Sequence, residues 1–206
     1  MDALIVVDVQ NDFLPGGALA VPKGNEVTAP INRLMRRFDL CVATQDWHPP
    51  GHLSFAENHP GRAVFERIEL DGLEQVLWPA HCVQGTLGAE FAKELEVRRF
   101  AHVTRKGTDP RIDSYSGFFD NGRRKATDLD AYLRSRNVTR VFVCGLALDY
   151  CVKFTALDAT RLGYRTVVVE DACRAIALDP EDYGRTLDEL RTAGVTIATA
   201  ESLPQC

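Results

Sequence analysis

The sequence predicts an α/β fold in which a parallel sheet lies between helical layers, a three-layer α/β/α arrangement. Short, continuous apolar runs recur along the chain and are typical of strands buried on both faces. Segments with helical periodicity separate several of these runs, and strand–helix–strand alternation favours parallel pairing. The 206 residues contain no repeat, low-complexity tract or linker, so we expect one domain over residues 1–206.

Six runs rich in β-branched residues are predicted as strands. Two long segments between them, 45–99 and 107–126, are rich in Pro, Gly, His and Asp, and loops of that length in a compact domain usually carry function. The predicted strands are residues 3–9 (ALIVVDV), 39–44 (DLCVAT), 100–106 (FAHVTRK), 140–146 (RVFVCGL), 165–171 (RTVVVED) and 194–200 (GVTIATA).

Four helices are predicted where a polar or capping residue precedes apolar residues at helical spacing. Glycines follow the third and fourth of these helices, as expected for helix ends. The helices begin at or beside Asn25, Asp128, Cys151 and Asp179, and the last two end at Gly163 and Gly194.

Composition and charge argue against several classes of function. The net charge of −5 and the pI near 5.6 disfavour a general affinity for nucleic acid or an anionic membrane. No apolar run approaches the ~18 residues of a membrane span, and the start MDALIVVDVQ lacks the pattern of a signal peptide. The six cysteines show no paired spacing, which predicts reduced thiols and a cytoplasmic location.

Residues capable of chemistry follow four of the predicted strands. Asp8 follows the apolar residues ALIVV of the first strand, Asp46 follows the second strand, Lys106 ends the third, and Cys151 comes after the fourth. In open parallel sheets, ligands bind outside the carboxyl ends of the strands. The sequence therefore predicts a carboxylate, a set of metal-type ligands, an amine and a thiol at one edge of the sheet.

Asp8 and Lys106 each have an ordinary interpretation as well as a functional one. A carboxylate at a strand end is commonly a turn or capping residue, and a lysine at a loop start is commonly solvated. Within IVVDVQNDF, however, Asp8 is expected to be desolvated, and burial raises the pKa of a carboxyl group toward that of a useful base. Gly107 allows a sharp turn after Lys106. Asp12, further into the loop, is interpreted as a turn residue.

Cys151 is the cysteine whose position indicates reactivity. It follows a strand and the tight GLALD turn and opens a predicted helix. A thiol at a helix N-terminus is expected to have a lowered pKa, and the N–H groups there can stabilise an oxyanion. The cysteines inside apolar runs are predicted as core residues. With Asp8 and Lys106, Cys151 forms a candidate nucleophile constellation.

The stretch ATQDWHPPGHLSF after the second strand has two interpretations. Asp46, His48 and His52 are either metal ligands or polar residues of a turn, and this window alone leaves both open. His59, in ENHPG, is predicted as a surface-loop residue. His102, in FAHVT, is predicted to pack on its strand rather than to bind metal.

Five segments of the chain are ALIVVDVQNDFLPGGALAV, TQDWHPPGHLSFA, WPAHCVQGTLGAEF, RKGTDPRIDSYSGFFDN and CGLALDYCVKFTALDA. Together these segments resemble the nicotinamidases and pyrazinamidases among the isochorismatase-like cysteine hydrolases. They occur in family order and span nearly the whole chain, so jointly they are highly specific. The resemblance implies a six-stranded parallel sheet between helical layers. It also implies hydrolysis of nicotinamide to nicotinate and ammonia through a cysteine thioester, as a step in NAD salvage.

The resemblance implies a catalytic role for particular residues. Asp8, Lys106 and Cys151 correspond to the family's triad. The backbone N–H groups of Ala147 and Cys151 correspond to its oxyanion hole, next to a cis peptide bond at Leu146–Ala147. The ring pocket is implied to be walled by Phe13, Trp78, Tyr115, Leu146 and Tyr150.

The resemblance further implies one divalent metal ion per subunit and no organic cofactor. The implied ligands are Asp46, His48 and His81, with His52 as a fourth whose place relatives fill differently. In the family the metal binds the pyridine nitrogen of the substrate. Such a carboxylate–imidazole set suits Zn²⁺, Fe²⁺ or Mn²⁺ without choosing among them. Cys82 is not counted among the metal ligands. It neighbours His81, and adjacent residues in an extended segment point in opposite directions.

The same residues disfavour several other functions. Related hydrolases act on isochorismate, N-carbamoylsarcosine or ureidoacrylate, and the DWH metal motif disfavours all three. A non-catalytic module that binds metal or senses redox state has no need of a full triad. A nucleotide-binding dehydrogenase is disfavoured because LPGGALAVPKG lacks the G-x-G-x-x-G spacing. The expected partner is a small-molecule substrate, without nucleic acid or membrane, and a homo-oligomer stays open.

Overall fold

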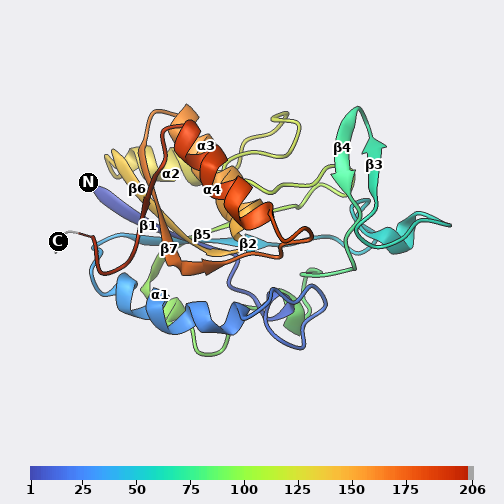
Figure 1. The fold of residues 1–206 in the computed structure, drawn as a ribbon, viewed down its shortest axis with the longest axis horizontal. Coiled ribbons are helices and arrows are strands. Elements are labelled where there is room, and N and C mark those ends of the chain that lie inside the picture. The colour runs from blue at the N-terminus through green and yellow to red at the C-terminus, as the bar shows by residue number, and fades with distance from the viewer. Residues whose placement is uncertain (204–206) are drawn as a thin grey trace.

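The computed structural model describes residues 1–203 and has the predicted three-layer architecture (Figure 1). Its middle layer is a six-stranded parallel sheet with the order β5-β2-β1-β6-β7-β8. Each predicted run forms one strand, with small shifts at the ends. The strands are β1 (Asp2–Val7), β2 (Cys41–Asp46), β5 (Phe100–Lys106), β6 (Arg140–Leu146), β7 (Arg165–Arg174) and β8 (Thr196–Ala198).

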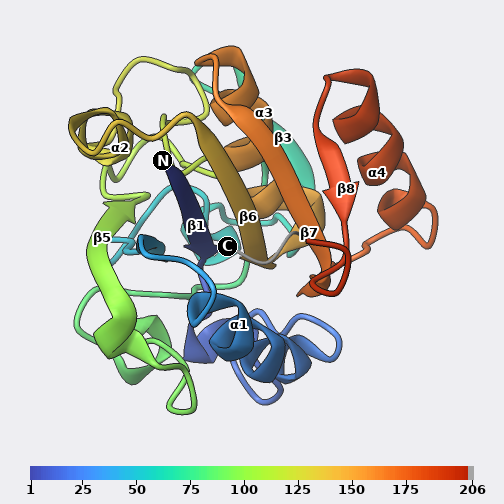
Figure 2. The same ribbon diagram turned by 90° about the vertical axis from the view of Figure 1, so that its left-hand side faces the viewer.

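Helices cover both faces of the sheet. One helix lies against one face and three lie against the other, as Figures 1 and 2 show from two sides. Within residues 1–203, none of the helices combines the length and apolar character needed to cross a bilayer. The first face carries α1 (Thr28–Met35), and the second carries α2 (Leu129–Ser135), α3 (Lys153–Arg161) and α4 (Asp182–Thr192).

Two helix starts differ from the prediction. Asn25 does not cap α1, because it lies inside a 3₁₀ turn, Gly24–Val27, whose backbone is already helical at Val27 and continues directly into the helix. Cys151 is not the first residue of α3, because a π-helical turn, Leu148–Val152, precedes that helix and contains it. Both starts are continuations of an earlier turn rather than capped ends.

A β-hairpin inside the long segment 45–99 is absent from the prediction. Its strands are β3 (Arg67–Leu70) and β4 (Leu73–Val76), and it stands at one end of the molecule, beyond the six-stranded sheet (Figure 1). Asp71 and Gly72 join the strands with φ values of 52° and 79°. An Asp-Gly pair between short alternating strands is a signal for this type of turn, so the sequence did contain the information.

The strand order places the direction change of the sheet between β1 and β6. From β1 the chain builds outward through β2 and β5, and later it builds outward on the other side through β6, β7 and β8. The residues of β1 from Ala3 to Val7 are fully buried, so the sheet is anchored at its centre. Ligands of open α/β sheets bind at such a switch point, outside the carboxyl ends of the strands. Asp8 follows β1 there, and the turn with Cys151 follows β6.

Candidate active site and metal centre

The ammonium group of Lys106 lies at the centre of the polar residues that follow the strands. Its Nζ is 2.9 Å from Asp8 Oδ2, 2.8 Å from Asp46 Oδ1 and 3.4 Å from Cys151 Sγ. It also donates a hydrogen bond to the carbonyl oxygen of Ser114 at 2.8 Å. All of these side chains are buried. The structure thus brings together one cation, two carboxylates and a thiol at a point that is largely shielded from solvent.

Asp8 is held as a desolvated carboxylate. It is fully buried, and its backbone adopts a left-handed φ of 48° where β1 ends. Its Oδ1 accepts a hydrogen bond from Thr44 Oγ1 at 2.6 Å. Burial raises the pKa of the Asp8 carboxyl more than the charge of Lys106 lowers it. Asp8 is therefore a stronger base than an exposed aspartate.

Cys151 is a buried thiol rather than an exposed thiolate. It is 6% exposed, and burial raises the pKa of its thiol well above the ordinary value, although Lys106 acts in the opposite direction. The expectation of a lowered pKa at a helix N-terminus is therefore wrong, because desolvation outweighs the favourable charges. Atoms of Asp8, Asp46 and Cys151 lie within 4.8 Å of one another. A thiol in this state needs a neighbouring base to become a nucleophile.

The turn before Cys151 has the backbone that the family resemblance implied. The Leu146–Ala147 peptide bond is cis. The N–H groups of Tyr150 and Val152 both donate to the carbonyl oxygen of Ala147 at 3.1 Å, which closes the π-helical turn around Cys151. Ala147 and Cys151 are thus held on one rigid turn at the end of β6.

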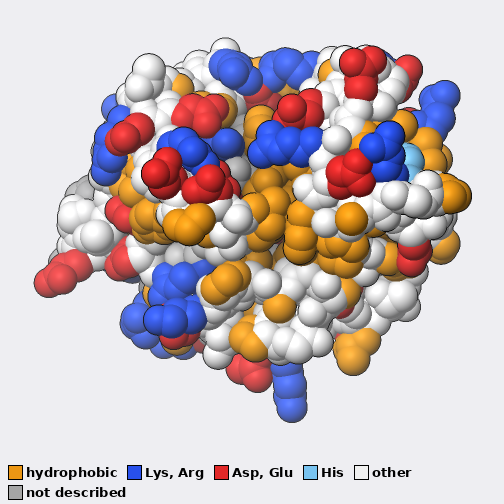
Figure 3. Space-filling model, turned by 45° about the vertical axis from the view of Figure 1, so that its right-hand side comes forward, with side chains coloured by type: hydrophobic (Ala, Val, Ile, Leu, Met, Phe, Trp, Pro, Cys, Tyr) orange, Lys and Arg blue, Asp and Glu red, His pale blue; other side chains and the backbone are white. Residues whose placement is uncertain are grey.

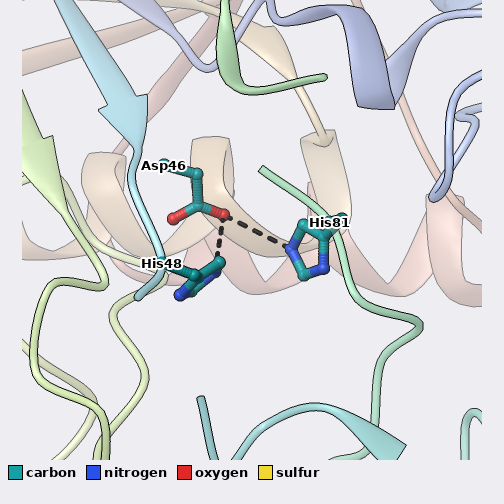
Figure 4. A group of neighbouring side chains, drawn as sticks. All are labelled: Asp46, His48 and His81. Atoms are coloured by element: carbon teal, nitrogen blue, oxygen red, sulfur yellow. Dashed lines mark ion pairs between the residues drawn. The ribbon is translucent and has the colours of Figure 1, made fainter. Parts of the chain in front are cut away.

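Two further buried side chains, those of His48 and His81, converge on Asp46. Asp46 Oδ2 lies 3.3 Å from His48 Nε2 and 3.5 Å from His81 Nε2 (Figure 4). The other oxygen of the same carboxylate contacts Lys106. Burial alone raises the pKa of Asp46, but Lys106 and then His48 lower it well below the ordinary value. Asp46 is thus an ionised carboxylate shared by the ammonium and the two imidazoles.

The ring orientations of His48 and His81 fit a metal ion. His48 Nδ1 donates to the carbonyl oxygen of Gly107 at 3.0 Å, and His81 Nδ1 donates to that of Pro79 at 2.8 Å. Because a carbonyl oxygen only accepts, each Nδ1 carries a proton, and Nε2 of each ring, which faces Asp46, is the atom that binds a metal ion once it is deprotonated. His48 Nε2 is buried without a hydrogen-bond partner. Three electron-pair donors facing one another are the donor set of a divalent cation.

Gly107 leaves the space that the His48 ring occupies. Its φ is +64°, and a Cβ atom at this position would lie 2.5 Å from His48 Cε1. The sharp turn expected after Lys106 is therefore present, and it also gives the ring of His48 its position.

His52 lies beside this cluster, and its Nδ1 is an acceptor rather than a donor. Its Nδ1 accepts the backbone N–H of Ser54 at 3.1 Å, so the neutral ring carries its proton on Nε2. Burial lowers the pKa of His52, which favours that neutral ring. His52 groups with His48 and Asp113, whose ligating atoms lie within 4.8 Å of one another. The place of His52 in the metal shell stays a prediction, and its Nε2, like that of His48, is buried without a hydrogen-bond partner.

Asp113 is a buried residue near the metal-type cluster that the sequence did not single out. Its Oδ1 lies 3.9 Å from His48 Nε2, and its Oδ2 accepts a hydrogen bond from Gln75 of β4 at 3.3 Å. The only signal for it was the length of the loop after Lys106.

Aromatic side chains form a wall next to the site. The ring centroid of Trp78 is 4.8 Å from that of Tyr150, and Tyr115 is 5.4 Å from Tyr150. Tyr115 accepts a hydrogen bond from the indole N–H of Trp78 at 3.1 Å. Phe13 lies 5.5 Å from the ring of His81. Leu146 is fully buried.

A cleft of about 450 Å³ lies on the outer side of this wall, between the hairpin and the helices α3 and α4. Tyr115, Tyr150 and Phe154 are part of its lining. Figure 3 shows a hollow on this side of the molecule with hydrophobic side chains inside it and charged side chains around it. The aromatic wall therefore separates the buried residues from a partly apolar surface cleft.

The remaining histidines and Cys82 lie outside the metal-type groups found among the described residues. His59 is half-buried in its loop and contacts the carbonyl oxygen of Leu53 at 2.7 Å. His102 stacks on Tyr132 with centroids 4.2 Å apart, in agreement with the prediction that it packs. Cys82 is buried.

The fold and the buried side chains of the site define a class of protein. A carboxylate, an ammonium and a thiol at the switch point of a parallel sheet, beside a metal-type cluster, are the groups expected of a hydrolase with an α/β/α fold and a candidate cysteine nucleophile. The sequence matches the isochorismatase domain model over residues 2–202. The chain therefore belongs to the isochorismatase family.

The chain is similar to nicotinamidases and pyrazinamidases of this family. The chain is 47% identical over 201 residues to the nicotinamidase of Escherichia coli (strain K12), covering 96% of this chain and 94% of the relative. Its structure is similar to that of the Acinetobacter baumanii nicotinamidase and pyrazinamidase, with a TM-score of 0.96 and 45% identity over 98% of both chains. It is also similar to the pyrazinamidase of Pyrococcus horikoshii in complex with zinc, with a TM-score of 0.79 and 41% identity over 96% of this chain and 98% of that one.

Proposed function

We propose that this protein hydrolyses nicotinamide to nicotinate and ammonia, that it also accepts pyrazinamide, and that it serves NAD salvage. The observation that carries the proposal is the buried contact of Lys106 with Asp8, Asp46 and Cys151. A binding module has no use for a desolvated base and thiol at one point. The names of its relatives support the same substrates.

In the first half of the reaction, Asp8 acts as the base and Cys151 as the nucleophile. Asp8 takes the proton from Sγ, and the sulfur attacks the carboxamide carbon to form a C–S bond. The N–H groups of Ala147 and Cys151 stabilise the oxyanion. Protonated Asp8 then gives its proton to the amide nitrogen as the C–N bond breaks and ammonia leaves. Lys106 keeps the charge of the site balanced throughout.

In the second half, a water molecule hydrolyses the thioester. Asp8, again ionised, takes a proton from the water as its oxygen attacks the acyl carbon. The C–S bond breaks, the proton passes from Asp8 to the sulfur of Cys151, and the acid product leaves. The raised pKa of Asp8 suits both directions of transfer, because the group must accept and donate a proton in each cycle.

We further propose that Asp46, His48 and His81 hold one divalent cation, and that His52 lies beside them. A cation held there would supply a Lewis acid for the ring nitrogen of the substrate. The aromatic side chains of Phe13, Trp78, Tyr115 and Tyr150, with Leu146, then position the ring so that its carboxamide faces Cys151. The zinc in the Pyrococcus horikoshii relative supports a divalent metal, and metal analysis decides among zinc, iron and manganese.

An ammonia-release panel tests the proposed function. Nicotinamide, pyrazinamide, N-carbamoylsarcosine and ureidoacrylate are compared, with and without a chelator. Turnover of the two ring amides that falls on chelation and returns with metal is the expected result. Preference for a linear amide, or equal turnover of ring amides after complete metal removal, would overturn the assignment of substrate and metal role.

A further inference from the structure

The loop after β1 contacts the backbone that carries Asp46. The amide of Gln10 is fully buried and makes three hydrogen bonds. Its Nε2 donates to the carbonyl oxygens of Asp46 and Ala89, each at 2.8 Å, and its Oε1 accepts the N–H of Asp46 at 2.8 Å. Both backbone polar groups of Asp46 are therefore held by one side chain. Since the backbone cannot rotate, the Asp46 carboxylate keeps its direction toward the two imidazoles.

The same loop contacts the segment that carries His81. Asp12 Oδ2 accepts the N–H of Cys82 at 2.7 Å, and Cys82 adopts a left-handed φ of 46°. The carbonyl oxygen of Cys82 in turn accepts the N–H of His48 at 3.0 Å. A Cβ atom at Gly88 would lie 2.1 Å from Asp12 Oδ2, so the glycine keeps this place open for the carboxylate. Asp12 thus has a second role beyond that of a turn residue.

These contacts reach all three proposed ligands from the loop that also carries Asp8. We propose that Gln10 and Asp12 are positioning residues of the metal centre, which fix the backbone at Asp46 and at His81–Cys82 so that the ligand atoms converge. The inference rests on the ligand set given under the proposed function. Metal affinity then depends on the loop after β1, although neither Gln10 nor Asp12 is itself a metal ligand. Residues that orient metal ligands typically change affinity by about 10–100-fold when removed.

Gln45 provides a matched control for Gln10. It precedes Asp46 directly, is 7% exposed, and its Nε2 donates to the same carbonyl oxygen of Ala89 at 2.9 Å. Its other hydrogen bond is to Arg105. The variants Gln10→Met and Gln45→Met therefore both lose the bond to Ala89, but only Gln10→Met also loses the two bonds to Asp46.

The test measures the dissociation constant of Zn²⁺ by competition with a chelating dye, on metal-free protein that keeps its far-ultraviolet circular dichroism. Gln10→Met is expected to weaken zinc binding about 10–100-fold, and Gln45→Met less than about threefold. Equal effects of the two variants, an unchanged constant for Gln10→Met, or no zinc binding by the wild type would overturn the proposal. The assay contains no substrate, so its result does not depend on which amide the protein hydrolyses.

Asp12 gives a second measurement that does not depend on a core substitution, because it is only half-buried. Asp12→Asn keeps an oxygen acceptor for the Cys82 N–H, whereas Asp12→Ala removes it. We expect Asp12→Ala to weaken zinc binding about tenfold or more and Asp12→Asn to stay within about threefold of the wild type. If both variants bound zinc as the wild type does, Asp12 would be a turn residue alone and its part of the proposal would fail.

Discussion

Replacement of Lys106 by methionine tests the charge balance at the centre of the site. Methionine keeps most of the unbranched stem but removes the ammonium that lies 2.9 Å from Asp8 Oδ2 and 2.8 Å from Asp46 Oδ1. In metal-free protein Asp46 keeps a cationic neighbour after this change. Its carboxylate raises the pKa of the His48 imidazole against the effect of burial and so favours the protonated form. Asp8 is then the buried carboxylate that loses its cation.

The magnitude follows from the cost of protonating Asp8. Holding an aspartate with an ordinary pKa of about 3.9 neutral at pH 7 costs about 4 kcal/mol, because each pH unit is worth about 1.4 kcal/mol. Burial already raises the pKa of Asp8 in the wild type, so part of this cost is present before the change. We expect the free energy of unfolding to fall by about 2–4 kcal/mol at pH 7, within the range for breaking a buried ion pair.

The loss should depend on pH in a defined direction. Without Lys106 the pKa of Asp8 in the folded state rises further above its unfolded value, so the folded state binds the extra proton. Stability then decreases as pH rises from the unfolded pKa to the folded one. The difference from the wild type should therefore shrink to about 1 kcal/mol at pH 5.

Urea unfolding at pH 5, 6 and 7, in the presence of a chelator, measures this difference. Lys153→Met is the control, because its ammonium lies 3.2 Å from the half-exposed Glu189 and such a surface pair contributes less than about 1 kcal/mol. A loss below about 1 kcal/mol at pH 7 for Lys106→Met, or a loss that does not grow between pH 5 and 7, would refute the account of Lys106 as the compensating charge.

Three further predictions concern the nucleophile, the metal ligands and the base. Cys151→Ala should lower ammonia release from nicotinamide at least about 10³-fold while leaving bound metal and thermal stability near wild type; substantial residual turnover would rule out the thioester route. His48→Ala should lower the metal content measured by mass spectrometry and raise KM for nicotinamide, whereas His52→Gln should keep the metal; parallel loss in both would make His52 a ligand. Thr44→Val removes the hydrogen bond to Asp8 Oδ1 and so raises the pKa of Asp8 further. Because the base must be ionised, the acid limb of the kcat/KM profile should move to higher pH by about one unit, and an unmoved limb would contradict the assignment of Asp8.

The sequence predicted the sheet and the position of the site because both depend on strong local patterns. Continuous apolar runs mark strands of a doubly covered sheet, and the residues just beyond them, such as Asp8 and Lys106, must then share one edge. The pKa direction of Cys151 was not predictable in the same way. Its helix-start position favours a low value, whereas the opposing effect comes from side chains distant in sequence that enclose it.

The supporting contacts of the site were the hardest part to predict. The bonds from Gln10 to Asp46 and from Asp12 to Cys82 join residues 36 and 70 positions apart in the sequence. A glutamine or aspartate in a loop has many local partners, so residue type alone does not identify a distant one. Asp113 lacks any local pattern as well, since it lies in a long segment, 107–126, without a helix or a strand. The hairpin is different, because its Asp71-Gly72 turn was a signal present in the sequence.

The enclosure of Cys151 has a consequence for chemical modification. A thiol that is 6% exposed and carries its proton reacts slowly with bulky or anionic thiol reagents and with peroxides, because these act on accessible thiolates. A neutral, ring-sized electrophile that enters as a substrate does would instead meet a sulfur activated by Asp8 at the moment of attack. Selective inactivators of this protein should therefore be sought among small ring aldehydes and nitriles rather than among general alkylating agents.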